Sequence, residues 1–218
     1  MANQFIYGIN PVAEAERGRR RVHRVWRAPE TSGEELERLC GSPDHQGVVA
    51  EVDPYPYGDP VGMLRKEGAL LIALDQVQDP RNLGAVCRSA EFAGAAGLVI
   101  PERRSAPVTP AVCKTSAGAV EHLEVAHVRN LADWLAEAKA AGFWIWGADA
   151  DAKQAPWKTD LTGSTVLVLG GEGKGLRPRV AAACDGLIAL PQLGQIESLN
   201  VSAAASSLLS EATRQRIT

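Results

Sequence analysis

Beyond residue 68 the chain alternates short apolar runs with longer segments that have the periodicity of helices. The apolar runs predict strands over residues 69–74, 97–100, 123–128, 143–147, 164–169 and 187–190. The periodic segments predict helices near residues 82–93, 110–119, 131–141, 176–183 and 198–216. Because the strands are apolar throughout, they are typical of a parallel sheet covered by helices on both faces. The pattern therefore predicts an open α/β domain, whose ligand sites lie at the carboxyl ends of strands.

A proline-rich stretch separates this pattern from the front of the chain. Residues 53–60 contain three prolines and one glycine, which disfavour regular structure and favour an extended linker. Before them, the pattern predicts helices near residues 10–17 and 33–40 and strands at 21–27 and 47–52. We therefore expect a small domain over residues 1–53, a linker over 54–65 and a larger domain over 66–218. A domain as small as the first has only a marginal core of its own.

The composition is that of a globular protein, with 45% hydrophobic and 22% charged residues among 218. No apolar run reaches the roughly 20 residues that span a bilayer, and the first residues lack the pattern of a secretory signal. The cysteines are scattered and the histidines lack ligand spacing. We therefore expect free thiols rather than disulfides or a metal site, and a cytoplasmic protein.

The charge distribution is uneven. The net charge of −3 argues against general binding of nucleic acid, yet residues 1–27 hold six arginines against two glutamates. This segment therefore carries +4, which leaves −7 for the rest of the chain. A basic end of this kind is typical of a phosphate-binding surface, although a solvated helix end is an equal alternative. The candidate RNA-binding residues are Arg19, Arg20, Arg21 and Arg24.

Three loops follow predicted strands and open predicted helices. In the first, Pro80 ends the strand, Asn82 is placed to cap the next helix, and Arg88 lies close enough to reach back. The alternative to a ligand site is that Asn82 is only a helix N-cap and Arg88 only a surface arginine.

The second loop, residues 170–175, has four glycines in six positions, so its backbone can approach a ligand closely. It is not a P-loop, because Gly175 rather than Ser or Thr follows Lys174. It is not a dinucleotide fingerprint either, because Leu176 occupies the third glycine position. Glu172 within the loop either needs a partner or is an ordinary acid at a helix start.

The third loop runs over residues 190–200 and places Ser198, Asn200 and Ser202 where the last helix opens. Ser198 and Asn200 could cap the helix or form a pocket with the other loops. The helix then continues with small side chains over residues 203–207. Its backbone can therefore approach another element closely, within the chain or across a subunit boundary.

In this order, the motifs DPRNLGAVCRSAEFAG, LVLGGEGKGL and IALPQLGQIESLNVSAAASSLLSEA resemble the SpoU branch of the SPOUT RNA methyltransferases, as does the intervening SAGAVEH. The resemblance covers residues 66–218. It is strongest to the group that methylates a guanosine ribose in large-subunit ribosomal RNA. Residues 7–12 and 45–50 also resemble that group's small substrate-binding domain, here shorter by about one strand and one helix.

The resemblance implies a trefoil-knotted α/β domain with a parallel sheet, active as a homodimer that binds S-adenosylmethionine in the knot and needs no metal. The implied cofactor-binding residues are Gly170, Gly171, Leu190, Pro191, Ser198 and Leu199. The implied active-site residues are Asn82, Arg88, Glu172, Ser198 and Asn200.

The chemistry fits these residues, because a sulfonium methyl is already activated and the enzyme must chiefly orient a ribose 2′-hydroxyl. An arginine stays protonated, so we expect Arg88 to clamp a phosphate and polarise the hydroxyl rather than to act as a base. Three alternatives are an inactive RNA-binding relative, a transfer-RNA methyltransferase of the same branch, and an ordinary nucleotide-binding α/β enzyme. The last alternative predicts a glycine loop after the first strand, whereas here it comes late in the chain.

Overall fold

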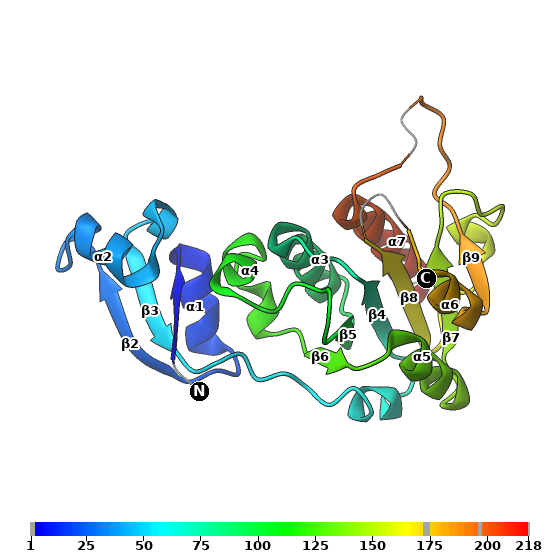
Figure 1. The fold of residues 1–218 in the computed structure, drawn as a ribbon, viewed down its shortest axis with the longest axis horizontal. Helices are drawn as coiled ribbons and strands as arrows, with labels where there is room; N and C mark the ends of the chain where they lie inside the picture. The colour runs from blue at the N-terminus through cyan, green and yellow to red at the C-terminus, as the bar shows by residue number, and fades with distance from the viewer. Residues whose placement is uncertain (1–2, 172–174, 196–197, 218) are drawn as a thin grey trace.

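The computed structural model describes residues 3–171, 175–195 and 198–217, which form two sheets joined by an extended segment (Figure 1). The first sheet is antiparallel, with the order β1-β3-β2. Its strands are β1 (Gln4–Tyr7), β2 (Val22–Arg27) and β3 (Val48–Val52). The strand β1 was not predicted from the sequence. It pairs with β3 so that Ile6 lies opposite Ala50 in the buried layer.

Two helices cover the first sheet, α1 (Ile9–Arg17) and α2 (Gly33–Cys40). The helix α2 begins where Ser32 caps it, because the Ser32 hydroxyl accepts a hydrogen bond from the backbone N–H of Glu35 at 3.2 Å. It ends at Gly41, whose φ of 69° suits glycine. Local capping signals therefore explain both ends of this helix.

The segment between the sheets is mostly extended and contains one 3₁₀ turn, η2 (Gly62–Arg65). In Figure 1 it is the cyan chain that crosses the lower part of the view from the small sheet to the large one. Tyr55 is buried and its hydroxyl donates to the carbonyl of Leu123, so the segment is attached to the larger domain at this residue.

The second sheet has six strands in the order β6-β5-β4-β8-β7-β9, and all neighbouring strands are parallel. The strands are β4 (Leu70–Asp75), β5 (Gly97–Pro101), β6 (Val125–Val128), β7 (Trp144–Ala148), β8 (Thr165–Gly170) and β9 (Gly186–Ile188). Every residue of β4 is buried. The predicted parallel sheet in an α/β domain is confirmed.

Helices cover both faces of this sheet. They are α3 (Pro80–Phe92), α4 (Pro110–Thr115), α5 (Leu131–Ala140), α6 (Pro178–Ala183) and α7 (Val201–Arg216), and this domain also has the 3₁₀ turns η3 (Ala119–Glu121) and η4 (Pro156–Lys158). A further 3₁₀ turn, η1 (Pro43–His45), lies in the small domain between α2 and β3. Alternate residues of β4 point to different cores. Ile72 and Leu74 join the layer with α3 and α7, whereas Leu71 and Ala73 join the layer with α5 and α6.

Three predicted helices are shorter than expected, and the one predicted over 176–183 begins at Pro178. The helix predicted over 110–119 ends at Thr115, because the backbone turns through positive φ at Ala117 and Gly118 before η3. The last helix begins at Val201 rather than 198, since Asn200 is its N-cap. Among the described residues, no helix is long and apolar enough to cross a membrane.

The close packing of α3 on α4 depends on Gly84. A Cβ at this position would overlap the Thr115 side chain and lie 3.0 Å from the backbone nitrogen of Ser116. This contact matters for the site because α3 carries both Asn82 and Arg88.

We expect Gly84→Ala to destabilise the protein by about 1–3 kcal/mol through overpacking, despite a gain in helix propensity of up to about 1 kcal/mol. Urea unfolding measures the change. The control is Gly33→Ala at the start of α2, where an added Cβ meets no atom within 4 Å. Equal free energies of unfolding for the two variants would contradict this packing argument.

Candidate cofactor and active site

Three loops meet at one edge of the large sheet, where β4, β8 and β9 end. Parallel strands put their carboxyl ends on the same edge, so loops that are distant in sequence come together there. In Figure 1 this edge is at the top of the large sheet, where the orange segment after β9 projects beyond the helices.

The first loop leads into α3 through Asp79, whose side chain accepts a hydrogen bond from the backbone N–H of Arg81 at 2.8 Å. The prediction that Asn82 caps this helix is therefore wrong. Pro80 occupies the first turn, where its missing N–H costs nothing, and the cap precedes it. As a result, the Asn82 side chain is buried and directed at another loop.

That other loop is the third one. Asn200 donates a hydrogen bond from Nδ2 to Oδ1 of Asn82 at 3.0 Å. Its own Oδ1 accepts from the backbone N–H of Ser202 at 2.8 Å and from the Ser202 hydroxyl at 2.6 Å. Asn200 thus caps α7 and also joins the first loop to the third. The prediction that Asn200 caps the last helix is confirmed, and its role in a pocket stays a prediction.

The second loop brings backbone against backbone. A Cβ on Gly170 would overlap the carbonyl group of Gly175, and one on Gly171 would lie 2.5 Å from the carbonyl oxygen of Gln76. Gly171 also donates its N–H to the carbonyl of Asp75 at 2.8 Å. Only glycine fits at these two positions. Glu172, predicted as an active-site residue, lies outside the described residues.

A buried acid binds the residues that follow the glycine loop. Asp75, the last residue of β4, is 1% exposed. Its carboxylate accepts hydrogen bonds from the backbone N–H of Arg177 at 2.9 Å and from Arg177 Nε at 2.7 Å. This pair was not predicted from the sequence. An acid directly at the end of an otherwise apolar strand was the available signal.

The third loop presents apolar side chains next to these polar groups. Leu190 is half-buried against the core, while Pro191, Ser198 and Leu199 are exposed, Leu199 to 59%. An exposed leucine next in sequence to Asn200, which is bonded to Asn82, is suited to a ligand with an apolar ring and polar edges. Gly170 and Gly171 have no side chain to cover the backbone at this edge, so the residues fit a nucleoside-like cofactor.

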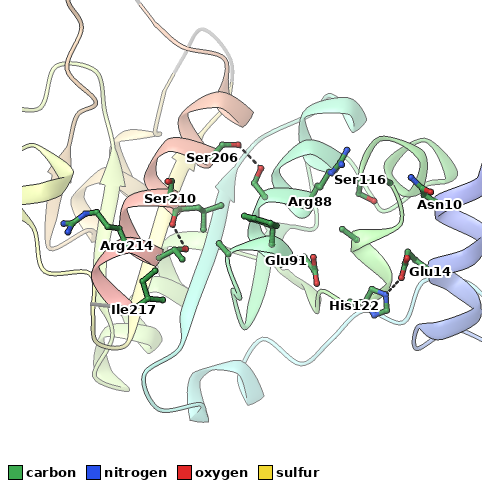
Figure 2. A pocket seen from close by; sticks show the side chains of 17 residues that line it. Asn10, Glu14, Arg88, Glu91, Ser116, His122, Ser206, Ser210, Arg214 and Ile217 are labelled. Carbon is green, nitrogen blue, oxygen red and sulfur yellow. Dashed lines mark hydrogen bonds and ion pairs between the residues drawn. The ribbon is translucent and has the colours of Figure 1, made fainter.

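Arg88 lies elsewhere. It is exposed on a groove of about 1090 Å³ between α3, α7 and the front of the chain (Figure 2). Within the described part of the chain, its side chain makes no hydrogen bond or ion pair. The groove also contains Ser206, which is hydrogen-bonded to Ser89 at 2.7 Å, and the exposed side chains of Phe92 and Ile217. One chain therefore joins Asn82 to Asn200 but places Arg88 on a separate surface.

The candidate RNA-binding arginines differ in their surroundings. Arg20 is buried in an ion pair with Glu121, so it cannot contact RNA in this fold. Arg19 donates from Nη2 to the carbonyl of Leu123 at 2.6 Å, which occupies part of its guanidinium. Arg21 is exposed, and Arg24 is exposed above the ring of Trp26 at 4.8 Å.

Residues 3–171, 175–195 and 198–217 contain no group of three or more His, Cys, Asp or Glu side chains that could hold a metal. The cysteines Cys40, Cys87, Cys113 and Cys184 are free thiols. Burial raises the pKa of Cys113 and Cys184 to about 12, so both are protonated near neutral pH.

Comparison with known proteins agrees with this geometry. The family model of the SpoU rRNA methylase family matches residues 69–210, and the model for RNA 2′-O ribose methyltransferase substrate binding matches residues 27–58. The chain is 37% identical to the putative TrmH family tRNA/rRNA methyltransferase YacO of Bacillus subtilis, covering 98% of this chain and 96% of YacO. It is 43% identical to the 23S rRNA (guanosine-2′-O-)-methyltransferase RlmB of Acinetobacter baylyi, covering 85% and 77%. Several other relatives are longer, and the chain spans 60–63% of their length.

Among solved structures, the SpoU methyltransferase AviRb from Streptomyces viridochromogenes in complex with AdoMet is 27% identical, with a TM-score of 0.82 over 100% of this chain and 91% of AviRb. The fold and the loops at its sheet edge thus define an RNA methyltransferase that uses S-adenosylmethionine. The chain belongs to the SpoU rRNA methylase family.

We expect Gly170→Ala to lower the affinity for S-adenosylhomocysteine at least about tenfold, or about 1.4 kcal/mol. The alanine Cβ would overlap the carbonyl group of Gly175, so the turn would have to open and change the backbone against which the cofactor binds. Isothermal titration calorimetry measures the affinity.

Gly163→Ala is the matched control, since Gly163 precedes the same strand at its other end and an added Cβ there meets no atom within 4 Å. The control should bind within about twofold of wild type. Unchanged binding by Gly170→Ala would show that the cofactor does not lie against this turn.

Proposed function

We propose that this protein transfers a methyl group from S-adenosylmethionine to the ribose 2′-hydroxyl of a guanosine in 23S-type ribosomal RNA. The observation that carries the proposal is the hydrogen bond between Asn82 and Asn200, which joins two loops beside the glycine turn at the sheet edge. The relationship to RlmB supports the choice of guanosine and of ribosomal RNA.

When bound, S-adenosylmethionine supplies an activated sulfonium methyl. The protein must therefore bring a ribose hydroxyl in line with it and exclude other nucleophiles. In this proposal, Asn82 and Asn200 orient the nucleotide, and Ser198 and Leu199 shape the pocket together with Leu190 and Pro191. Arg88 stays protonated, holds a phosphate beside the target ribose and polarises its hydroxyl, whose proton leaves to water. Glu172 would hold Asn82, Arg88 or the backbone amides of the glycine turn in place.

The position of Arg88 supports a homodimer. In one chain Arg88 faces the groove rather than the joined asparagines, so a second copy would have to deliver it to the cofactor loops. The groove contains two large apolar side chains that are mostly exposed, Phe92 to 91% and Ile217 to 79%. Exposed apolar surface of this kind is typical of a protein–protein contact. The face of α7 beside it is lined by Ser206 and Ser210, whose small side chains permit close approach. We propose that copies of this chain pair through this groove, in the cytoplasm, and that the methyltransferase domain contains a trefoil knot.

Arg21 and Arg24 remain the proposed RNA contacts of the small domain, because both are exposed on or beside β2. A transfer-RNA substrate is the second candidate. It is supported by relatives named as tRNA/rRNA methyltransferases. The small front domain favours ribosomal RNA, because its counterpart among family models is a substrate-binding domain.

Arg88→Ala should reduce methyl transfer to ribosomal RNA by at least about 10³-fold while leaving cofactor affinity within a few-fold, because the guanidinium acts on RNA and not on the donor. Transfer from radiolabelled cofactor measures the first quantity and calorimetry the second. Arg38→Ala, on the exposed side of α2, removes an equal charge and should retain full activity. If Arg88→Ala lost cofactor binding in proportion to activity, this role would be refuted. A wild-type protein that binds the cofactor and RNA but transfers no methyl group would instead be the inactive relative.

Phe92→Glu should convert the dimer to a monomer, because it places a charge at the centre of an apolar contact. Light scattering after size-exclusion chromatography gives the mass. Trp157→Glu, at another exposed aromatic residue that lies outside the groove, is the control and should stay dimeric. A dimer that survives Phe92→Glu would place the interface elsewhere.

A further inference from the structure

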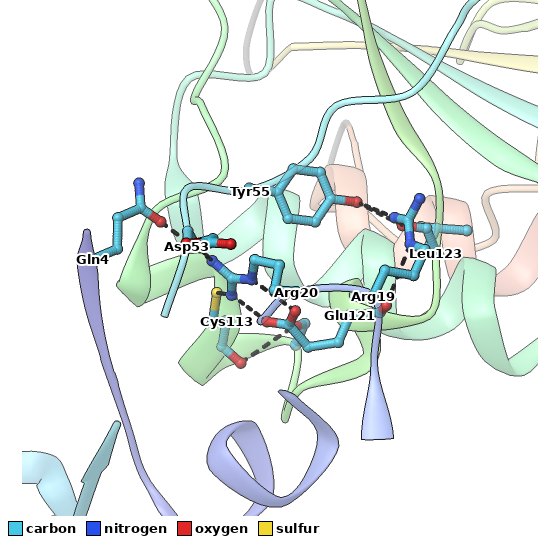
Figure 3. Close-up of polar contacts among 9 residues, drawn as sticks. Gln4, Arg19, Arg20, Asp53, Tyr55, Cys113, Glu121 and Leu123 are labelled. Carbon is cyan, nitrogen blue, oxygen red and sulfur yellow. Dashed lines mark hydrogen bonds and ion pairs between the residues drawn. The ribbon is translucent and has the colours of Figure 1, made fainter. Parts of the chain in front are cut away.

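The small domain is joined to the catalytic domain by a buried ion pair (Figure 3). Arg20 lies two residues before β2, and Glu121 ends η3 of the catalytic domain, so the pair spans 101 residues of chain. The side chains are 1% and 0% exposed. Arg20 Nε donates to Glu121 Oε2 at 2.8 Å, and Arg20 Nη2 donates to Glu121 Oε1. This is the bidentate geometry in which an arginine defines orientation as well as distance.

The remaining donors of Arg20 are also used. Nη1 donates to Gln4 Oε1 at 3.2 Å, and Nη2 donates to Cys113 Sγ at 3.2 Å. Burial opposes the charge of Arg20, but the bonds to Glu121 raise its pKa overall, so the guanidinium stays charged. Arg20 therefore contacts β1 of the small domain and both α4 and η3 of the catalytic domain at once.

A second set of contacts lies beside the pair. Arg19 Nη2 donates to Tyr55 Oη at 2.9 Å, and Tyr55 Oη donates to the carbonyl of Leu123 at 2.6 Å. Burial raises the pKa of Tyr55, so its hydroxyl keeps the proton that it donates. The linker residue Tyr55 is thus tied to both domains.

At two glycines, one in each domain, the backbone leaves no space for a side chain. A Cβ on Gly18 would lie 2.8 Å from Cβ of Glu121, and one on Gly118 would lie 2.6 Å from Cβ of Glu14. The backbone of the small domain therefore lies directly on the segment that carries Glu121. That segment packs in turn on α3, through Thr115 and Gly84. The helix α3 carries Asn82 and Arg88, so only the segment with Glu121 lies between the small domain and this helix.

An ion pair is a costly way to stabilise such a contact. Two charges lose their hydration on burial, and apolar side chains of similar size often stabilise as well or better. What a bidentate pair adds is a defined angle between the elements that carry it. Arg20 is followed in sequence by the proposed RNA contacts Arg21 and Arg24. The angle set by the pair is therefore the angle between those contacts and the catalytic helix.

We propose that Arg20 and Glu121 are positioning residues that hold the RNA-binding face of the small domain at a fixed orientation to the catalytic helix, so that one RNA engages both at once. The inference rests on the proposed function. When two contact surfaces are held rigidly, the second one binds at a high effective concentration, and a loosened joint loses that advantage. The pair thus acts on RNA affinity and not on the methyl donor.

The decisive variant is the double substitution R20M/E121M, which removes both charges and leaves no unpaired buried ion. We expect it to fold with a melting temperature near that of wild type and to bind S-adenosylhomocysteine normally. Its KM for ribosomal RNA should rise about tenfold while kcat changes less than about threefold. R20K, which keeps the charge but not the fork, should give an intermediate KM.

The matched control is K66M/E124M, which removes an exposed ion pair at 3.0 Å within the catalytic domain and should leave KM unchanged. Small-angle X-ray scattering supplies a second readout that needs no activity. We expect wild type and the control to fit one domain arrangement and R20M/E121M to fit a wider range. If R20M/E121M kept wild-type KM and wild-type scattering, the proposal would be overturned. If the wild type methylated no RNA, the proposed function would fail, while the scattering would still decide whether the pair fixes the domains.

Discussion

The site depends on backbone meeting backbone at the carboxyl edge of the parallel sheet. Between the ends of β4 and β8, Gly170 lies against Gly175, and Gly171 lies against the chain that follows Asp75. Side chains would hold these strands' loops apart, and the buried carboxylate of Asp75 binds Arg177 to keep the turn closed. The third loop reaches the same edge because β9 belongs to the same parallel sheet. Once the three loops meet, the bond between Asn82 and Asn200 can form.

The small domain also depends on contacts with another part of the chain. Its size leaves it only a marginal core of its own, yet Ile6, Val12 and Val52 belong to the same buried cluster as residues of β4, α3 and α7. The small domain is thus stabilised by docking as well as by its own packing. The buried Arg20–Glu121 pair adds direction to that docking, which apolar contacts alone do not supply. The helix α3 is therefore central to both domains. Asn82 on α3 bonds the third loop, and Arg88 on the same helix lines the groove.

Much of the fold could be predicted from the sequence because strands buried on both faces and amphipathic helices have distinct local patterns. The strand β1 was missed because four residues, Gln4–Tyr7, are too few to show alternation. Asn82 was misread as a helix cap because the sequence offers Asp79 and Asn82 on either side of Pro80, and only the structure shows which one bonds the free N–H. Arg20 was predicted to bind RNA together with the neighbouring arginines, because a local cluster of charge does not reveal a partner 101 residues away. The pairing of Asp75 with Arg177 is likewise a tertiary contact that no local pattern encodes.

The central claim is that the protein methylates a ribose in ribosomal RNA at the site on this edge of the sheet. It is tested most directly by mapping 2′-O-methyl groups at nucleotide resolution in RNA from cells with and without this protein. The account predicts that one guanosine of 23S-type ribosomal RNA loses its ribose methyl group when the protein is absent. It also predicts that the wild-type chain restores the methyl group. An unchanged pattern of ribose methylation in ribosomal RNA, or a loss confined to transfer RNA, would contradict it.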